Sequence, residues 1–549
     1  MKTALIGRSN KNAEIITPGW HSWDGSFSEL QIKWQQLDAV VQSAHIEDDL
    51  VILITQKSIP VLPVKLILEM GMLWNYPGKL SLKDDVLLAE ISSQTIKIFC
   101  TAQQTAFDPY VESMTPFLCL NLQDEIGISS GKKRSVSEIK AAIQAQKKLL
   151  LKSAKKHYGD LAETFLAVQA GIAWNTIFEP KYKRVVSTVG RLWNREYGGY
   201  CLFGWDNFFL AYICSIDNPD LAIANLIEHM KSITGEGFIP NDDRGNGTKS
   251  FDRSQPPVGS IMTAKIYEMC PEKWVLQEIF DDLLSWNRWW LKTRMNNSLL
   301  SYGSHLAKNI LNEPNVNTII AAKYESGMDD SPMYSNVPFN KNKNVMELID
   351  VGLNSLYIAD CKALATIAEI IGKDKEVVEL NVRAEQFSER IQKLWNEEAG
   401  CFLNFRTDLQ KFSAEISPTM FFPLLAGIAD EDKKEKIIKL FYDHQKLGGD
   451  WILPSITRDH PDYHKQCYWK GAIWPPLNFL AWLSFKAGGL KKEADLLADR
   501  SEHIFMKEWK RKGFVCENYS ALSGTGDDDR LSSDSFHSWG SLMGVMKLI

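Results

Sequence analysis

The chain carries a tight cluster of carboxylic acids whose spacing suits proton transfer. Glu325, Asp329 and Asp330 lie within six residues. Neighbouring carboxylates repel one another, so a site that holds them together raises the pKa of at least one acid, as a proton donor near neutral pH requires. Far downstream, Glu517 stands among apolar and amide side chains. Asp329 and Glu517 are therefore candidates for an acid and a base, although the cluster alone would also suit a solvated turn.

Four loops together supply aromatic, acidic, arginine and proline residues. They span residues 198–207, 237–257, 325–332 and 468–476, and Glu517 and residues 536–540 follow the last of them. A sugar offers many hydroxyls and an apolar ring face, which Asp, Arg, Gln and Trp can meet together. A phosphate would call for glycine-rich turns with lysine, and a metal for histidine clusters. The recurrence of these residue types favours a carbohydrate site.

Each loop also has a structural interpretation of its own. The Arg253–Pro257 stretch is typical of a helix start, and Trp205 with Asp206 is typical of a buried tryptophan followed by a helix cap. Trp474, which precedes two prolines, could simply belong to a hydrophobic core.

Composition excludes several classes of partner. Among 549 residues, 45% are hydrophobic and 24% are charged, as in ordinary globular proteins. The net charge of -6 supports neither a nucleic-acid tract nor a polybasic membrane surface. The 18 tryptophans suit stacking on sugar rings, although they could also fill a large helical core. We expect a neutral oligosaccharide or glycoside as partner, with no nucleic acid and no membrane.

Cysteine usage and the first residues bear on compartment and cofactor. The nine cysteines are odd in number and form no Cys-x-x-Cys pair, which argues against a zinc knuckle and a disulfide framework. A reducing, cytoplasmic location is the simplest expectation, or a periplasmic or secreted one if a leader has been removed.

We expect no cofactor and no catalytic metal. His460 and His464 are separated by a proline, and Asp527–Asp529 is expected to be a solvated loop rather than a calcium site.

The first part of the chain has the texture of a β-rich domain. Short apolar runs rich in β-branched residues predict strands at 50–55, 64–68, 95–99 and 117–122. We therefore predict a sandwich-like N-terminal domain over residues 1–130.

Helical patterns take over after Gly131. Residues 133–178 carry long apolar repeats of helical period. We divide the chain after residue 130 into a helical linker at 131–155 and a catalytic domain at 156–549. One stripe runs from Leu353 to Ile371, where Gly372 can end the helix, and a second runs from Val377 to Leu394. Paired helices with functional loops at one end predict a mainly α toroid, an (α/α) barrel.

Several motifs resemble known glycosidases. The segments YGGYCLFGWDNFF, YESGMDDSP, YWKGAIWPP and ENYSALSG with FHSWG resemble glycoside hydrolase family 63, and GFIPN with RSQPP is similar to the trehalases of family 37. The resemblance covers about residues 155–549 in the family order. It implies an (α/α)6 barrel and an inverting, exo-acting α-glycosidase, chiefly an α-glucosidase, that works without a metal.

By the same resemblance, Asp329 matches the general acid and Glu517 the general base. Inversion then requires the two carboxyl groups to stand roughly 6.5 to 9.5 Å apart, leaving room for a water. The resemblance also implies a set of sugar-binding residues: Trp205, Asp206, Asn241, Arg253, Gln255, Glu325, Lys470 and Trp474. His537 and Trp539 join the candidates, His537 as a residue that orients water or substrate or as a hydrogen-bonded core histidine.

The sequence departs from the family pattern in two places. A glycine-rich insertion occupies residues 242–247, and Lys470 stands where family members often have arginine. Lysine binds as a point charge rather than as a fork, which changes the expected hydrogen bonding there.

Two other functions fit part of the pattern. A sugar epimerase on the same barrel would need a His or Lys base pair in the pocket, and only His537 among ten histidines lies in a motif loop. A non-catalytic carbohydrate-binding protein would keep the tryptophans but would not need two placed acids.

Overall fold

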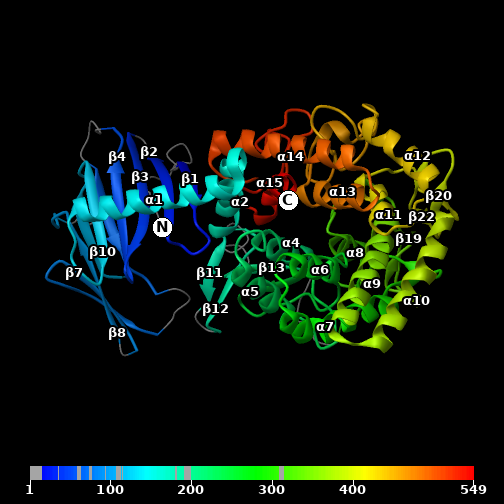
Figure 1. Cartoon of the computed structure of the whole chain (residues 1–549), viewed down its shortest axis with the longest axis horizontal. Coiled ribbons are helices and arrows are strands. Elements are labelled where there is room, and N and C mark those ends of the chain that lie inside the picture. The colour runs from blue at the N-terminus through cyan, green and yellow to red at the C-terminus, as the bar shows by residue number, and fades with distance from the viewer. Residues whose placement is uncertain are drawn as a thin grey trace. The chain divides into compact units, whose positions relative to one another are not determined.

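The structure is a computed structural model of the chain. It describes residues 15–34, 36–58, 64–72, 77–92, 94–106, 113, 115–179, 182–190, 199–307 and 315–549. The chain forms two compact units: residues 1–174, 180–183 and 509–514 make the first, and residues 175–179, 184–508 and 515–549 make the second. Figure 1 shows the strand-rich first unit in blue and cyan and the helix-rich second unit in green to red. The domain boundaries at residues 130 and 155 stay predictions.

The first unit contains an eight-stranded antiparallel sheet in the order β1-β2-β3-β4-β10-β8-β7-β6. Its strands are β1 (Ile15–His21), β2 (Phe27–Trp34), β3 (Leu37–Ile46), β4 (Asp49–Gln56), β6 (Lys79–Lys83), β7 (Val86–Ile91), β8 (Gln94–Cys100) and β10 (Glu125–Ser130). A separate pair joins β5 (Lys65–Glu69) to β9 (Phe117–Asn121). The β-rich character of this region and its four predicted strands are confirmed, since those runs coincide with β4, β5, β8 and β9 to within one residue.

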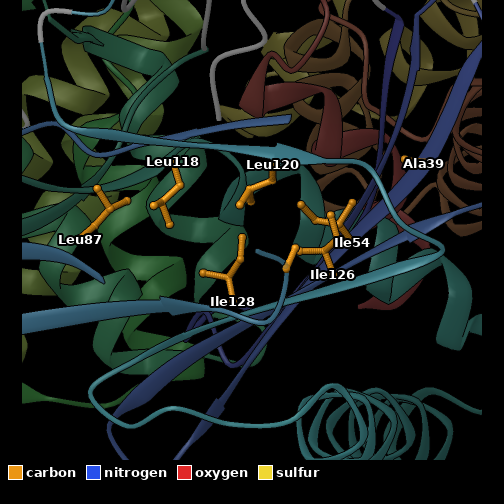
Figure 2. Packing of buried hydrophobic residues seen from close by; sticks show 8 residues of the cluster. Ala39, Ile54, Leu87, Leu118, Leu120, Ile126 and Ile128 are labelled. Carbon is orange, nitrogen blue, oxygen red and sulfur yellow. The ribbon is translucent and has the colours of Figure 1, made fainter. Parts of the chain in front are cut away.

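Alternating side chains bury the two faces of the large sheet differently. On one face, Ile54, Ile126 and Ile128 share an apolar cluster with Leu118 and Leu120 of β9 (Figure 2). On the other, Phe27, Val51 and Leu53 pack with Ile139 and Ile143 of helix α1 (Val136–Tyr158). Period-two alternation produces this division, because successive side chains of a strand point to opposite faces.

Helix α1 starts at a capping box and is followed by α2. The Ser135 side chain accepts from the Glu138 N–H, and the Glu138 carboxylate accepts from the Ser135 N–H. Helix α2 (Ala162–Ala173) is buried over almost its whole length. The helical prediction for residues 133–178 extends too far, because Thr176–Glu179 forms strand β11, which pairs with β12 (Arg184–Ser187).

Helices dominate the second unit. They are α4 (Gly204–Cys214), α5 (Pro219–Met230), α6 (Gly259–Met269), α7 (Lys273–Thr293), α8 (Ile319–Ser326), α9 (Val351–Ile371), α10 (Asp374–Ile391), α11 (Phe422–Leu425), α12 (Glu431–Tyr442), α13 (Pro475–Ala487), most of α14 (Lys491–Lys512), and α15 (Leu542–Leu548). Every residue of α4 is buried, whereas α10 and α12 bury only one stripe. The second unit therefore contains both enclosed and amphipathic helices.

The predicted helix pair is confirmed in detail. Asp350 caps the N-terminus of α9, and Gly372 ends it in a left-handed conformation with φ of 81°. Helix α10 packs along α9 and continues into a 3-10 turn at Gln392–Leu394. Short two-stranded pairs join the helices, among them β13 (Cys201–Phe203) with β14 (Asp242–Arg244). None of the helices in the described residues combines the length and apolarity needed to cross a lipid bilayer.

Candidate active site

A cavity of about 410 Å³ in the second unit collects most of the predicted site residues. Its lining contains nine of them: Trp205, Asp206, Asn241, Arg253, Gln255, Asp329, Glu517, His537 and Trp539. It also contains Phe203, Asp242, Arg244, Asn315, Tyr324, Gly327, Tyr468 and Trp469. Asp329 and Glu517, which lie far apart along the chain, thus face the same cavity.

The end of α8 turns Asp329 toward the cavity. Gly327 ends the helix in the left-handed region, with φ of 69°. A Cβ atom at this position would lie 2.7 Å from Cζ2 of Trp205. Glycine is therefore needed twice, for the backbone angle and for the close approach to the tryptophan ring.

The adjacent acid, Asp330, binds a different segment. Its carboxylate accepts hydrogen bonds from the Trp469 backbone N–H at 2.9 Å and from Lys470 Nζ at 2.7 Å. Asp330 thus links the segment carrying Asp329 to the aromatic loop at 468–474. The structure places Lys470 in this ion pair, outside the cavity lining, because its ammonium is engaged by Asp330.

The pKa of Asp329 is raised to about 7. Burial is the largest cause, because it penalises the charged form, and the charge of Asp330 adds to it. The guanidinium of Arg253 opposes the rise. An acid with this pKa keeps its proton at neutral pH often enough to donate it.

Two hydrogen bonds to the Asp534 backbone hold Glu517, one from its own backbone and one to its side chain. Its N–H donates to the Asp534 carbonyl at 2.9 Å, and its Oε2 accepts from the Asp534 N–H at 3.0 Å. Burial and the charge of Asp534 raise the pKa of Glu517 well above its usual value, and the charges of Asp206 and Asp329 raise it further. The backbone hydrogen bond from Asp534 works in the opposite direction, since it favours the carboxylate.

Asp206 and His537 stand together in the lining. Asp206 lies in the first turn of α4 and is buried, which raises its pKa well above normal, with Asp329 as an additional cause. His537 Nε2 lies 3.8 Å from Asp206 Oδ1. Burial lowers the pKa of His537 to about 3, so its ring is neutral at physiological pH.

A set of stacked aromatic rings forms one side of the site. The Trp469 and Trp474 rings stack with centroids 3.7 Å apart, and Trp539 meets Trp474 edge-on at 5.7 Å. Trp205 in turn meets Trp539 at 6.0 Å. Trp474 lies behind the lining and donates its indole N–H to the Tyr468 carbonyl at 3.1 Å. The structure therefore gives Trp474 a supporting position and puts Trp469 at the cavity surface.

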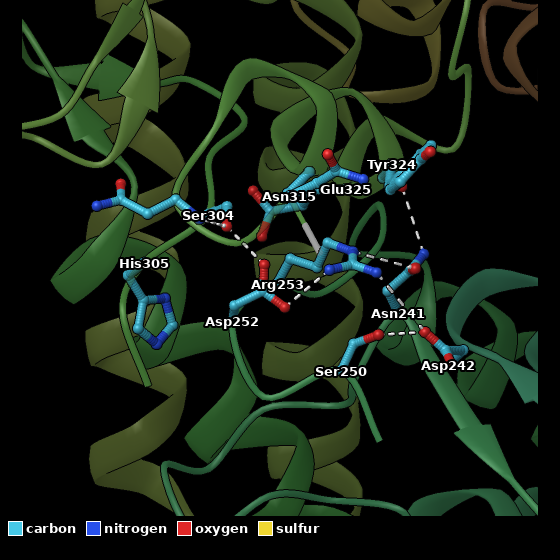
Figure 3. Close-up of polar contacts among 12 residues, drawn as sticks. Asn241, Asp242, Ser250, Asp252, Arg253, Ser304, His305, Asn315, Tyr324 and Glu325 are labelled. Carbon is cyan, nitrogen blue, oxygen red and sulfur yellow. Dashed lines mark hydrogen bonds and ion pairs between the residues drawn. The ribbon is translucent and has the colours of Figure 1, made fainter. Parts of the chain in front are cut away.

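Arg253 is fixed by several partners (Figure 3). Its Nη1 donates to Asp252 Oδ1 at 2.8 Å, and its Nε donates to Asn241 Oδ1 at 3.3 Å. Asn241 Nδ2 donates to the Tyr324 carbonyl at 3.3 Å, and the Arg253 guanidinium lies 5.4 Å from the Tyr324 ring centre. These contacts limit the rotamers that Arg253 can adopt.

The glycine-rich insertion contributes to the wall. Pairing of β13 with β14 brings Asp242 and Arg244 to the cavity, where they form an ion pair. The Ser250 hydroxyl also donates to Asp242. Gln255, further along the same loop, accepts the Trp205 backbone N–H at 3.0 Å through its Oε1.

Glu325 is the third predicted residue outside the lining. It is fully buried and pairs with Arg294, which is also fully buried. The resemblance implies that the Glu325 carboxylate binds sugar, but in the structure this carboxylate binds Arg294 instead.

Eight lining residues are not among the predicted site residues. Five of them stand inside the motifs that carry the resemblance, and this position in a motif could have identified them as site residues: Phe203, Tyr324, Gly327, Tyr468 and Trp469. Asp242 and Arg244 belong to the insertion, and nothing in the sequence marks Asn315. Gly198, which opens the first predicted loop, lies outside the described residues.

The arrangement suits proton transfer across a bound sugar. It offers buried acids with raised pKa values, flat aromatic surfaces and a fixed guanidinium. Within the part of the chain that the structure describes, no three His, Cys, Asp or Glu side chains are grouped so that they could hold a metal ion. Asp528, in the loop weighed as a calcium site, instead pairs with Arg530 at 2.8 Å.

Comparison with known proteins finds similar glycoside hydrolases. The model of the mannosylglycerate hydrolase MGH1-like glycoside hydrolase domain matches residues 200–539. Mannosylglycerate hydrolase of Thermus thermophilus is 21% identical over 391 residues, covering 60% of this chain and 87% of that protein. Glucosylglycerate hydrolase of Mycolicibacterium hassiacum is 22% identical over 387 residues, covering 54% and 82%.

Solved structures show the same fold. The crystal structure of the family 63 mannosylglycerate hydrolase from Thermus thermophilus in complex with Tris superimposes with a TM-score of 0.57 and 17% sequence identity. The match covers 70% of this chain and 99% of that structure.

Proposed function

Because this chain belongs to the mannosylglycerate hydrolase MGH1-like family of glycoside hydrolases, we propose that it is an inverting, exo-acting α-glycosidase with Asp329 as general acid and Glu517 as general base. One observation carries the proposal: both acids are buried in the lining of one cavity, and the pKa of Asp329 is raised to about 7. Asp329 would protonate the glycosidic oxygen while Glu517 removes a proton from water on the opposite face of the sugar ring.

The proposed chemistry assigns a task to each side of the cavity. Trp205, Trp469 and Trp539 would stack on the apolar face of the sugar. Its hydroxyls would bind a set of polar residues: Asp206, Asn241, Arg253, Gln255 and His537. We propose that Lys470, Trp474 and Glu325 act through their neighbours, because each is engaged outside the lining.

We further propose that the catalytic domain spans residues 156–549 and is an (α/α)6 barrel. Helix α4 contacts α6, α6 contacts α9, α9 contacts α11, α11 contacts α13, α13 contacts α15, and α15 contacts α4 again. Such a succession is what six inner helices arranged in a ring would give. The amphipathic helices α5, α7, α10, α12 and α14 would form the outer layer.

The sugar is proposed to be an α-linked glucose, and the leaving group has two candidates. The first is a short neutral oligosaccharide or glycoside. The second is glycerate, which two relatives carry in their names. Arg244, which lines the cavity and is not assigned to the sugar hydroxyls, favours the second candidate, because a guanidinium group in a cavity wall suits a carboxylate.

An epimerase is less well supported. Such an enzyme needs a His or Lys base pair at the sugar. Among the described lining residues there is no lysine, and the one histidine, His537, has a pKa lowered to about 3.

The test combines substrate, stereochemistry and variants. α-Glucosides and α-mannosides of glycerate are compared with trehalose, nigerose and kojibiose, and NMR follows the first anomer released. We expect the β anomer first, and an α anomer would instead require a covalent intermediate. Asp329→Asn should lower hydrolysis by about 10²-fold or more while sugar binding survives. Unchanged hydrolysis by this variant would remove Asp329 from the acid role and leave a carbohydrate-binding function open.

A further inference from the structure

The buried ion pair between Glu325 and Arg294 lies near the cavity and is densely hydrogen-bonded. Arg294 Nε donates to Glu325 Oε2 at 2.7 Å, and Arg294 Nη2 donates to Oε1 at 2.8 Å. Both side chains are fully buried. The fork geometry fixes their relative orientation as well as their charge.

Two backbone N–H groups also donate hydrogen bonds to the Glu325 carboxylate. Oε1 of Glu325 also accepts from the Ser254 N–H at 2.9 Å, and Oε2 also accepts from the Gly303 N–H at 2.6 Å. On the other side, Arg294 Nη2 donates to the Asp252 carbonyl at 3.0 Å. The guanidinium also lies 4.6 Å from the Trp289 ring centre.

These contacts join segments that carry cavity residues. Ser254 lies between Arg253 and Gln255, which both line the cavity. Glu325 stands in the last turn of α8, two residues before Gly327 and four before Asp329. Figure 3 draws Glu325 together with Asp252 and Arg253.

We infer that the Glu325–Arg294 pair is a positioning unit for the reaction, which holds the segment bearing Asp329 against the segment bearing Arg253. The inference rests on the proposed function, since it assigns the pair to the placement of the general acid. Neither member touches the cavity, so neither is a catalytic residue. The pair acts on the geometry of proton donation, and only weakly on reactions that need no proton.

Leaving-group dependence separates this role from a merely structural one. α-D-Glucosyl fluoride needs little protonation to leave, whereas 2-O-α-D-glucosylglycerate, an alkyl glycoside, depends on the general acid. We expect Glu325→Gln to lower kcat on the alkyl glycoside by at least about ten-fold more than kcat on the fluoride. The alkaline limb of its pH–rate profile should also shift, because Arg253 would be held less firmly beside Asp329.

The chain contains a matched control on α7, the helix that ends immediately before Arg294. Arg288 of α7 binds Glu379 of α10 through the same two-pronged geometry, but their side chains are 49% and 31% exposed. Glu379→Gln should leave the ratio of the two activities unchanged. Equal losses on both substrates in Glu325→Gln, or no loss on either, would overturn the inference.

Two further variants keep the outcome clear. If Glu325→Gln does not fold because Arg294 is left as an unpaired buried charge, the double variant Glu325→Gln with Arg294→Gln removes both charges and should show the same selective loss. Asp329→Asn serves as the reference for a missing acid. If it shows no selective loss, the acid assignment and this inference both fall, whereas a selective loss in Asp329→Asn alone overturns only the positioning role.

Discussion

At the residue scale, Asp330 tunes the acid beside it by charge. Its carboxylate raises the pKa of Asp329, and Lys470 partly neutralises that carboxylate at 2.7 Å. As the proposed general acid, Asp329 must be protonated to act, so activity should fall as pH rises through a pKa of about 7. Besides burial and Arg253, Asp330 and Lys470 therefore influence the position of the alkaline limb.

Substituting Asp330 and substituting Lys470 should shift the alkaline limb of the pH profile in opposite directions. Asp330→Asn deletes the charge that raises the pKa of Asp329, so the alkaline limb of kcat/KM should move to lower pH. Lys470→Met leaves the Asp330 charge uncompensated, so the limb should move to higher pH. Lys491→Met, which breaks an exposed pair with Asp495, should leave the profile in place. Shifts in the same direction for the two site variants would contradict the ion-pair account.

The two acids should also differ in their response to the leaving group. Asp329→Asn should retain much of the hydrolysis of α-D-glucosyl fluoride, because departure of fluoride needs little protonation. Glu517→Gln should lose activity on the fluoride and on the glycosides alike, since both reactions need an activated water. Steady-state kinetics on the two substrate types measures this difference, and the reverse pattern would exchange the roles of Asp329 and Glu517.

At the scale of elements, the end of α8 decides where the acid points. Gly327 adopts φ of 69° against Trp205, and Gly372 adopts φ of 81° at the end of α9 with open space around it. Gly327→Ala should lower activity by about ten-fold or more, since a Cβ 2.7 Å from the Trp205 ring must displace it and shift Asp329.

Gly372→Ala is the matched control for that change. It carries the same cost of a left-handed alanine, roughly 1 kcal/mol, without a steric clash. Its free energy of unfolding should fall by about that amount, measured by urea unfolding, while its activity stays at the wild-type level. If Gly372→Ala lowers activity as much as Gly327→Ala does, contact with Trp205 is not the reason that α8 needs a glycine.

How much could be foreseen depended on the element. Period-3.6 stripes ended by glycine predicted α9 and its cap correctly, because apolar spacing and a left-handed residue are local signals. The motif at 325–332 was a weaker guide to individual side chains. Glu325 and Asp329 lie in one motif, yet only Asp329 faces the cavity, because Arg294 and Gly303 reach Glu325 from segments that local spacing does not reveal. Asn315 also enters the lining, although it lies outside every motif.

At the scale of the whole molecule, burial of the cavity acids should lower stability at high pH. Asp329 has a pKa of about 7 in the folded chain, against an ordinary value of 3.8 for the side chain in water. A raised pKa means that the folded state binds the proton more tightly than the unfolded state. Its stabilising contribution is complete below about pH 4 and is lost as pH rises through about 7.

Asp329→Asn should therefore be more stable than the wild type at pH 8, and the advantage should vanish near pH 4. The upper limit of the gain is about 4 kcal/mol, from about 1.4 kcal/mol for each pKa unit. Urea unfolding at the two pH values measures it, with Asp528→Asn as a control of opposite sign. Arg530 holds the pKa of Asp528 below its usual range, so that variant should lose stability at neutral pH and recover at low pH. A gain of equal size at both pH values for Asp329→Asn would mean that packing of the amide, rather than relief of a buried charge, stabilises the variant.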